Sequence, residues 1–260
     1  MAQELSPIEE YTDPEEYDLE NGLDGPELPF YGALARETGG PGLDLACGTG
    51  FLTLPLADAG LAMTGVDASP EMLDHARRKG AARPIRWLLA DCRLLDLGET
   101  FRLITLTGNS FQAFLTRADQ EALLGTVRRH LAPGGLFAFE TRFPRAGTLF
   151  DLSTPDGAWS PEIPWRTFEN EQGQTVNVST TQRHDPIRQT VAYAIHRRWQ
   201  EGGAERVKTE QTTLRFVYPA EMEALLHYNG LAIRDAYGDW DRQPLAATSP
   251  RMIYVCQRRD

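Results

Sequence analysis

The sequence contains few cysteines and no long apolar run. Its three cysteines among 260 residues show no Cys-x-x-Cys spacing, so neither a disulfide framework nor a zinc site is expected. No stretch reaches the roughly 18 apolar residues that a bilayer-spanning helix needs. The first residues are acidic, where a secretory signal would be basic. We therefore expect a cytoplasmic protein without a membrane-spanning segment.

Positive charge is also scarce. The formal net charge is −11, from 26 Lys and Arg against 37 Asp and Glu. Residues 1–27 hold ten of these acids and neither Lys nor Arg, so the rest of the chain is nearly neutral. Binding to nucleic acid requires a basic face that neutralises phosphates, and neither part offers one. We expect neither a nucleic-acid partner nor a membrane partner.

The most informative feature that is present is a glycine-rich turn in residues 43–50, between an apolar strand and a helix. Gly48 and Gly50 lack a Cβ, so the backbone can take positive φ angles and approach a ligand closely. The helix that follows offers unpaired N–H groups. A dinucleotide-binding loop would have a third glycine where this sequence has Thr53. The turn therefore indicates a small cofactor and argues against an NAD(P)-dependent oxidoreductase, which is one alternative.

Acidic residues follow the apolar strands of the same region. A carboxylate can accept hydrogen bonds from both hydroxyls of a ribose, which suits Asp67. Asp91 could accept from an adenine amino group, with the backbone amide of Cys92 facing a ring nitrogen. Either acid could instead cap a helix or form a turn. Asp44, under the glycine turn, could attract an ammonium group or orient the loop.

The remaining pattern alternates helices with strands. Helices are predicted at about 29–38, 50–59, 70–79, 117–131 and 219–228, and strands at about 42–46, 62–66, 85–90, 102–107, 136–140, 231–236 and 251–257. This alternation predicts an α/β fold with a doubly wound, Rossmann-like sheet. Ligands of such sheets bind at the carboxyl ends of the strands. We expect residues 29–141 and 218–260 to form this cofactor-binding core.

Residues 142–217 interrupt the alternation. Four strand-like runs are joined by turn-rich segments of hairpin length, at 165–170, 175–183, 189–199 and 206–217. They predict an inserted antiparallel β meander, which could roof a substrate pocket or form a dimer contact. Monomer and homodimer both remain open.

Residues 1–28 form an acidic N-terminal segment with more aromatic side chains than a solvated tail needs. The segment is either a solvated leader or a lid that folds over the cofactor cleft. Tyr17 and the nearby Tyr31 are the residues that we expect to act in such a lid.

In combination, these motifs resemble the class I S-adenosylmethionine (SAM) dependent methyltransferases of the small-molecule type. The matching landmarks, in the order of that family, are Leu43–Gly50, Met63–Asp67, Trp87–Asp91, Phe101–Gln112 and Leu131–Glu140. The resemblance implies a seven-stranded, mostly parallel sheet with an antiparallel last strand, and SAM as cofactor without a metal. The expected cofactor-binding residues are Tyr17, Tyr31, Asp44, Ala46, Cys47, Gly48, Thr49, Gly50, Asp67, Ala68, Met72, Asp91, Cys92 and Thr107.

The chemistry of methyl transfer then indicates which residues at the end of the fourth predicted strand could contact the acceptor. The methyl group of a sulfonium is already activated, so the protein must mainly align the acceptor and exclude water. Asn109 and Ser110 are expected to face this methyl group, although an Asn-Ser pair also forms turns. His196 in the meander is a candidate base. We predict N-methylation of a small-molecule amine, with a SAM-binding sensor that lacks catalysis as the alternative.

Overall fold

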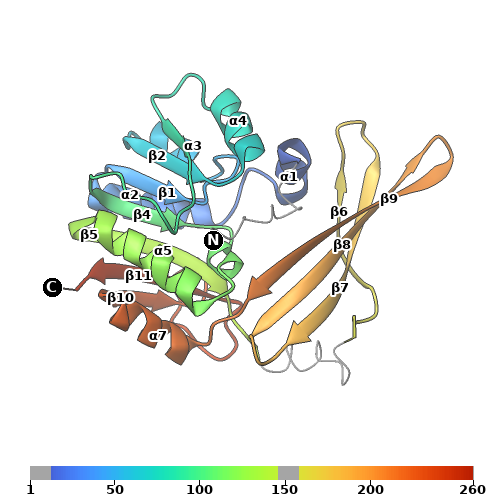
Figure 1. The fold of residues 1–260 in the computed structure, drawn as a ribbon. Coiled ribbons are helices and arrows are strands. Elements are labelled where there is room, and N and C mark those ends of the chain that lie inside the picture. The colour runs from blue at the N-terminus through green and yellow to red at the C-terminus, as the bar shows by residue number, and fades with distance from the viewer. Residues whose placement is uncertain (1–12, 146–157, 260) are drawn as a thin grey trace. The chain divides into compact units, whose positions relative to one another are not determined.

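The computed structural model describes residues 13–145 and 158–259. Residues 1–12 of the predicted lid, and part of the loop predicted before the meander, lie outside the described residues. The chain divides into two compact units, which Figure 1 draws. Residues 24–145 and 215–260 form the core unit, and residues 1–23 and 146–214 form the insert unit.

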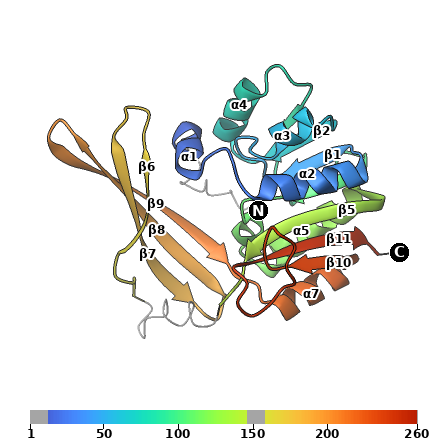
Figure 2. The same cartoon turned by 180° about the vertical axis from the view of Figure 1, so that it is seen from behind.

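The core unit contains a seven-stranded sheet (Figures 1 and 2). Its strands are β1 (Gly42–Leu45), β2 (Met63–Asp67), β3 (Arg86–Leu89), β4 (Phe101–Leu106), β5 (Leu131–Arg142), β10 (Leu231–Tyr237) and β11 (Arg251–Arg258). Their order is β10-β11-β5-β4-β1-β2-β3. The first five strands pair in parallel, and β11 runs antiparallel to both of its neighbours. The predicted fold class is confirmed.

Helices cover both faces of this sheet. They are α2 (Glu27–Thr38), α3 (Thr53–Asp58), α4 (Pro70–Lys79), α5 (Arg117–His130) and α7 (Pro219–Tyr228). Side chains of α2 and α3 pack with Leu136 and Ala138 of β5, whereas α5 and α7 pack with Phe137 and Phe139 on the opposite face. Because both faces are covered, the central strands are apolar without alternation.

Local sequence signals account for two of these helices. Ser69 caps α4 through a hydrogen bond from the Met72 amide, and a proline occupies the first helical position. Thr116 and Asp119 form a reciprocal capping box at the start of α5. The predicted start of β5 was wrong, because the strand begins at Leu131, which pairs with Phe101 across a register shift. Residues 132–135, between the predicted helix and the predicted strand at 136–140, lie within the irregular first part of β5.

The insert unit contains the predicted meander as a four-stranded sheet. Its strands are β6 (Ile163–Glu169), β7 (Thr175–Asp185), β8 (Thr190–Glu201) and β9 (Ala204–Arg215), in this order. The pairs β6–β7 and β7–β8 are antiparallel. A small apolar cluster around Val176, Val178 and Ile195 occupies one face.

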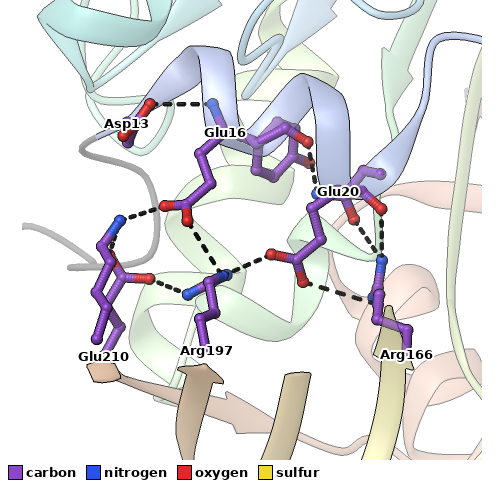
Figure 3. Close-up of polar contacts among 9 residues, drawn as sticks. Asp13, Glu16, Glu20, Arg166, Arg197 and Glu210 are labelled. Atoms are coloured by element: carbon purple, nitrogen blue, oxygen red, sulfur yellow. Dashed lines mark hydrogen bonds and ion pairs between the residues drawn. The ribbon is translucent and has the colours of Figure 1, made fainter. Parts of the chain in front are cut away.

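Helix α1 (Pro14–Asn21), which the sequence patterns did not predict, also belongs to the insert unit. Ion pairs connect it to the four-stranded sheet (Figure 3). The Arg197 side chain of β8 is only 4% exposed. Its guanidinium donates to Glu20 of α1 at 2.7 Å and to Glu210 of β9. Arg166 donates to the Glu20 carbonyl oxygen at 3.2 Å. Lys208 completes this α1 ion network by binding Glu16.

Candidate cofactor and methyl-transfer site

The candidate site lies at the carboxyl edge of the parallel strands. Strand β1 lies between β2 and β4 in the sheet. The strand that follows it in sequence, β2, pairs on one side of β1, whereas β4 pairs on the other side. Such a switch point leaves a crevice in which open α/β sheets bind ligands. The segments that follow β1, β2, β3 and β4 carry most of the predicted site residues.

The glycine turn and Asp67 meet at this edge. The Gly48 amide donates a 2.7 Å hydrogen bond to Oδ2 of Asp67. Gly48 has φ 53°, and nothing lies within 4 Å of where a Cβ would be, so this side of the turn is open to a ligand. At Gly50, with φ 83°, a Cβ would come within 3.0 Å of Trp87. The two glycines therefore serve different purposes, open access at Gly48 and close packing at Gly50.

Asp67 keeps the capacity to bind hydroxyl groups. Its Oδ1 accepts from the Ser69 amide at 2.9 Å, and burial raises the pKa of the carboxyl group above its ordinary value. Each carboxylate oxygen still has a second lone pair, so two hydroxyls can be accepted in addition. In the segment that follows, Ala68 is exposed, whereas Met72 is buried.

Asp44 is fully engaged inside the protein. It is 1% exposed, and its oxygens accept from the Thr53 hydroxyl at 2.6 Å and the Thr105 hydroxyl at 2.7 Å. Burial raises its pKa to about 6. Asp44 thus ties β1 to β4 and α3, which favours the loop-orienting alternative. Thr53, which replaces the third glycine of a dinucleotide loop, has its hydroxyl committed to this contact.

Around the turn, the side chains are mostly buried. Cys47 and Thr49 are buried, Ala46 is half-buried, and Ala46 takes a positive φ of 50°. Burial raises the pKa of the Cys47 thiol well above its ordinary value. The turn therefore offers main-chain groups rather than a reactive side chain.

Asp91 is paired with an arginine that the sequence interpretation missed. Arg93 donates to Oδ2 of Asp91 from Nε at 3.0 Å and from Nη2 at 2.7 Å, and its Nη1 donates to Asp119 at 2.5 Å. Burial opposes ionisation of Asp91, but the hydrogen bonds from Arg93 hold its pKa below the ordinary value. The Cys92 side chain is buried, which raises its pKa to about 12. Asp91 is thus an ionised acceptor, held in place by Arg93.

The segment after β4 places Asn109 and Ser110 in a tight turn. The Ser110 hydroxyl donates to the Thr107 carbonyl at 2.5 Å, which is the turn-forming role that the sequence left open. Thr107 itself is buried. Asn109 takes a left-handed conformation with φ 59°, and its amide donates to Glu140 at 3.1 Å. Asn109 and Ser110 are both half-buried at the edge.

The Tyr31 side chain is held inside the protein by a buried hydrogen bond. It lies in α2 of the core unit, is fully buried, and donates from its hydroxyl to Glu140 at 2.6 Å. Its ring packs near those of Phe30 and Trp240. Helix α2 begins at Glu27, slightly before the predicted start at about residue 29, and it contains Tyr31. The proposed role of Tyr31 toward the cofactor stays a prediction. Glu140 was missed, although an acid at the end of an apolar strand was the signal that identified Asp67.

Two further site residues belong to the insert unit. Tyr17 is half-buried on α1, and His196 lies on β8, where its Nδ1 is 3.0 Å from the Thr209 hydroxyl. Their proposed roles toward the cofactor and the acceptor stay predictions.

Within the described parts of the chain, no three His, Cys, Asp or Glu side chains are grouped as metal ligands would be. Nor does any helix in those parts have the length and apolar character to cross a membrane.

Comparisons with known proteins identify the family of this chain. A family model described as a methyltransferase domain matches residues 43–135. The putative methyltransferase YqeM of Bacillus subtilis (strain 168) is 35% identical over 221 residues, covering 83% of each chain. The cypemycin N-terminal methyltransferase of Streptomyces sp is 28% identical over 219 residues, 84% of this chain and 82% of that one. The X-ray structure of the sugar N-methyltransferase KedS8 from Streptoalloteichus sp ATCC 53650 is similar with a TM-score of 0.68, at 23% identity, over 94% of this chain and 91% of that chain. The chain belongs to the SAM-dependent methyltransferases.

Proposed function

We propose that this methyltransferase transfers the methyl group of SAM to an amine nitrogen of a small molecule. The observation that carries the proposal is the junction of the glycine turn with Asp67, beside a half-buried Asn109 at the neighbouring strand end. The names of two similar proteins, which specify methylation at an N-terminus and at a sugar nitrogen, support nitrogen as the acceptor atom.

The residues of the core unit would bind the cofactor at its two ends. The open backbone at Gly48 allows close approach, and Asp67 would accept from the ribose hydroxyls. Asp91, held ionised by Arg93, would accept from the adenine amino group. When bound, SAM supplies a methyl group that is already activated for displacement.

Asn109 would orient the acceptor. A carboxamide oxygen can accept from an amine N–H and leave the nitrogen lone pair free to attack. The amine must be neutral when it attacks, and His196 is proposed as the group that accepts a proton. The surplus of negative charge and the lack of a basic face in the sequence favour a small molecule over a nucleic acid.

Two measurements test this function. Calorimetry with SAM, its demethylated product S-adenosylhomocysteine (SAH) and NADH should show binding of the first two only. Labelled SAM incubated with amines, amino sugars, phenols and carboxylic acids should label amines. Label on oxygen acceptors alone would contradict N-methylation. Binding of SAM with no transfer to any class would favour a sensor.

A further inference from the structure

Glu140 connects helix α2 to the turn that carries Asn109. Its Oε2 accepts the 2.6 Å hydrogen bond from the Tyr31 hydroxyl, and its Oε1 accepts the 3.1 Å bond from the Asn109 amide. Glu140 is 3% exposed, so bulk water does not compete for these bonds. Because β5 lies beside β4, the carboxylate at the end of one strand reaches the turn after the other.

The backbone of Asn109 needs such a fixed partner. Its φ of 59° is in the left-handed region, which few residues other than glycine adopt, with asparagine among the tolerated exceptions. The Ser110 hydroxyl closes the same turn onto the Thr107 carbonyl. The bond to Glu140 selects this conformation, since the amide would leave its acceptor if the backbone relaxed.

The side chain of Asn109 takes no part in the hydrogen bonds that fix this turn. Among the described residues, its carboxamide makes no hydrogen bond, whereas its backbone amide and the Ser110 hydroxyl are both bonded within the protein. A carboxamide offers two donors and an acceptor, and half-burial limits how many of these water can satisfy. A polar group of a ligand bound at the carboxyl edge of the sheet would supply hydrogen-bond partners for this carboxamide.

We infer that Glu140 is a positioning residue for methyl transfer, which fixes the Asn109 backbone so that the carboxamide points at the acceptor. This inference rests on the proposed function, because it takes the end of β4 as the acceptor side. Tyr31 supports Glu140 by fixing its second oxygen. A carboxamide that is free to turn away would present the acceptor in fewer productive orientations, which lowers the rate of transfer.

Amide hydrogen exchange of the protein without ligands tests the structural half of the inference. The variants are Glu140→Gln and the more conservative Tyr31→Phe. The matched control is Glu121→Gln, at a half-buried position of α5 whose carboxylate pairs with Arg117. In Glu140→Gln a single carboxamide oxygen remains for the two donors, the Tyr31 hydroxyl and the Asn109 amide. Exchange in residues 107–112 should therefore speed up by about tenfold in this variant and by less in the Tyr31 variant. The control should exchange at the wild-type rate. Unchanged exchange in both variants would overturn the inference.

A double-mutant cycle with Asn109→Gly tests the catalytic half. Glycine accepts the left-handed backbone but has no carboxamide. In the wild-type background, Glu140→Gln should lower kcat about tenfold with an SAH dissociation constant within about threefold of wild type. In the Asn109→Gly background, the same change should lower kcat by less than about twofold. Equal losses in both backgrounds would show that Glu140 does not act through Asn109.

The hydrogen-exchange experiment and the double-mutant cycle together distinguish a failure of this inference from a failure of the proposed function. If only oxygen acceptors are labelled, N-methylation fails, and the cycle is measured with that acceptor. If no acceptor is labelled, the proposed function fails, while hydrogen exchange still shows whether Glu140 holds the turn. Tyr31→Phe keeps the aromatic packing, so a folding defect of Glu140→Gln would not remove the test.

Discussion

The amide of Gly48 and the carboxylate of Asp67, which are 19 positions apart, are joined by a 2.7 Å hydrogen bond at the carboxyl edge of the sheet. This bond fixes the acid directly beside the open side of the glycine turn. A ligand that contacts the backbone of the glycine turn is therefore also beside Asp67, whose carboxylate can accept hydrogen bonds from two hydroxyl groups.

Asp67→Ala should weaken SAM binding by about 1.5 to 3 kcal/mol, because charged hydrogen bonds to the ribose would be lost. Isothermal calorimetry with SAM measures this change. Asp58→Ala is the matched control, since Asp58 is a half-exposed acid at the end of α3 that pairs with Arg83. An affinity that is equal in wild type and the Asp67 variant would remove Asp67 from the site.

Thr53→Val should destabilise the core unit by about 1 to 3 kcal/mol, because it leaves a buried oxygen of Asp44 without its hydroxyl partner. Urea unfolding measures the loss. Thr100→Val, at an exposed position, should change stability by no more than about 0.5 kcal/mol. Equal effects of the two substitutions would show that the Thr53 hydroxyl contributes nothing specific.

The stability of the protein should depend on the ionisation of Glu140. Burial raises the pKa of this carboxyl group to about 7, although Tyr31 and the amides of Gly108 and Asn109 bond to it, and Glu27 adds a like charge. Since the folded pKa exceeds the unfolded one, the stabilising contribution is complete below the ordinary pKa of glutamate and is lost as the pH rises through about 7.

Glu140→Gln removes this titration and provides the measurement. From about pH 5 to about pH 8, the free energy of unfolding of wild type should fall relative to that of the variant by about 2 to 3 kcal/mol. Urea unfolding at a series of pH values gives the difference. A difference that stays constant over this range would mean that the carboxyl group ionises at its ordinary pKa.

Arg197→Met should detach helix α1 from the inserted sheet. The change leaves the buried carboxylates of Glu20 and Glu210 without their shared cation, which costs about 3 to 5 kcal/mol. Hydrogen exchange of residues 14–21 should speed up accordingly. Arg188→Met, which breaks an exposed pair with Asp185, should leave α1 unaffected. Full protection of α1 in the Arg197 variant would show that other contacts hold it.

How much the sequence predicted depends on where each signal lies. Helices α4 and α5 were predicted because Ser69 and Thr116 form caps within their own first turns. Asp67 was predicted because a strand, a glycine turn and an acid follow one another in a known order. These contacts are local, or they follow from the topology of a parallel sheet.

Features that depend on distant partners were missed. Helix α1 has no apolar stripe, since its buried positions are Pro14 and Glu20, and its partners on β8 and β9 are far away in sequence. Glu140 and Tyr31 are 109 positions apart, and neither side chain alone indicates the other. Arg93 was missed because an arginine two residues after an aspartate does not indicate from sequence alone whether the two side chains form an ion pair or are solvated on a loop.

The most direct test of the central claim is a crystal structure of the protein with SAH. The account predicts that the ribose hydroxyls lie within hydrogen-bonding distance of Asp67, the adenine amino group near Asp91, and the amino-acid end along the turn at Gly48. An adenosyl group bound away from these three residues, or in a different cavity of the core unit, would contradict it.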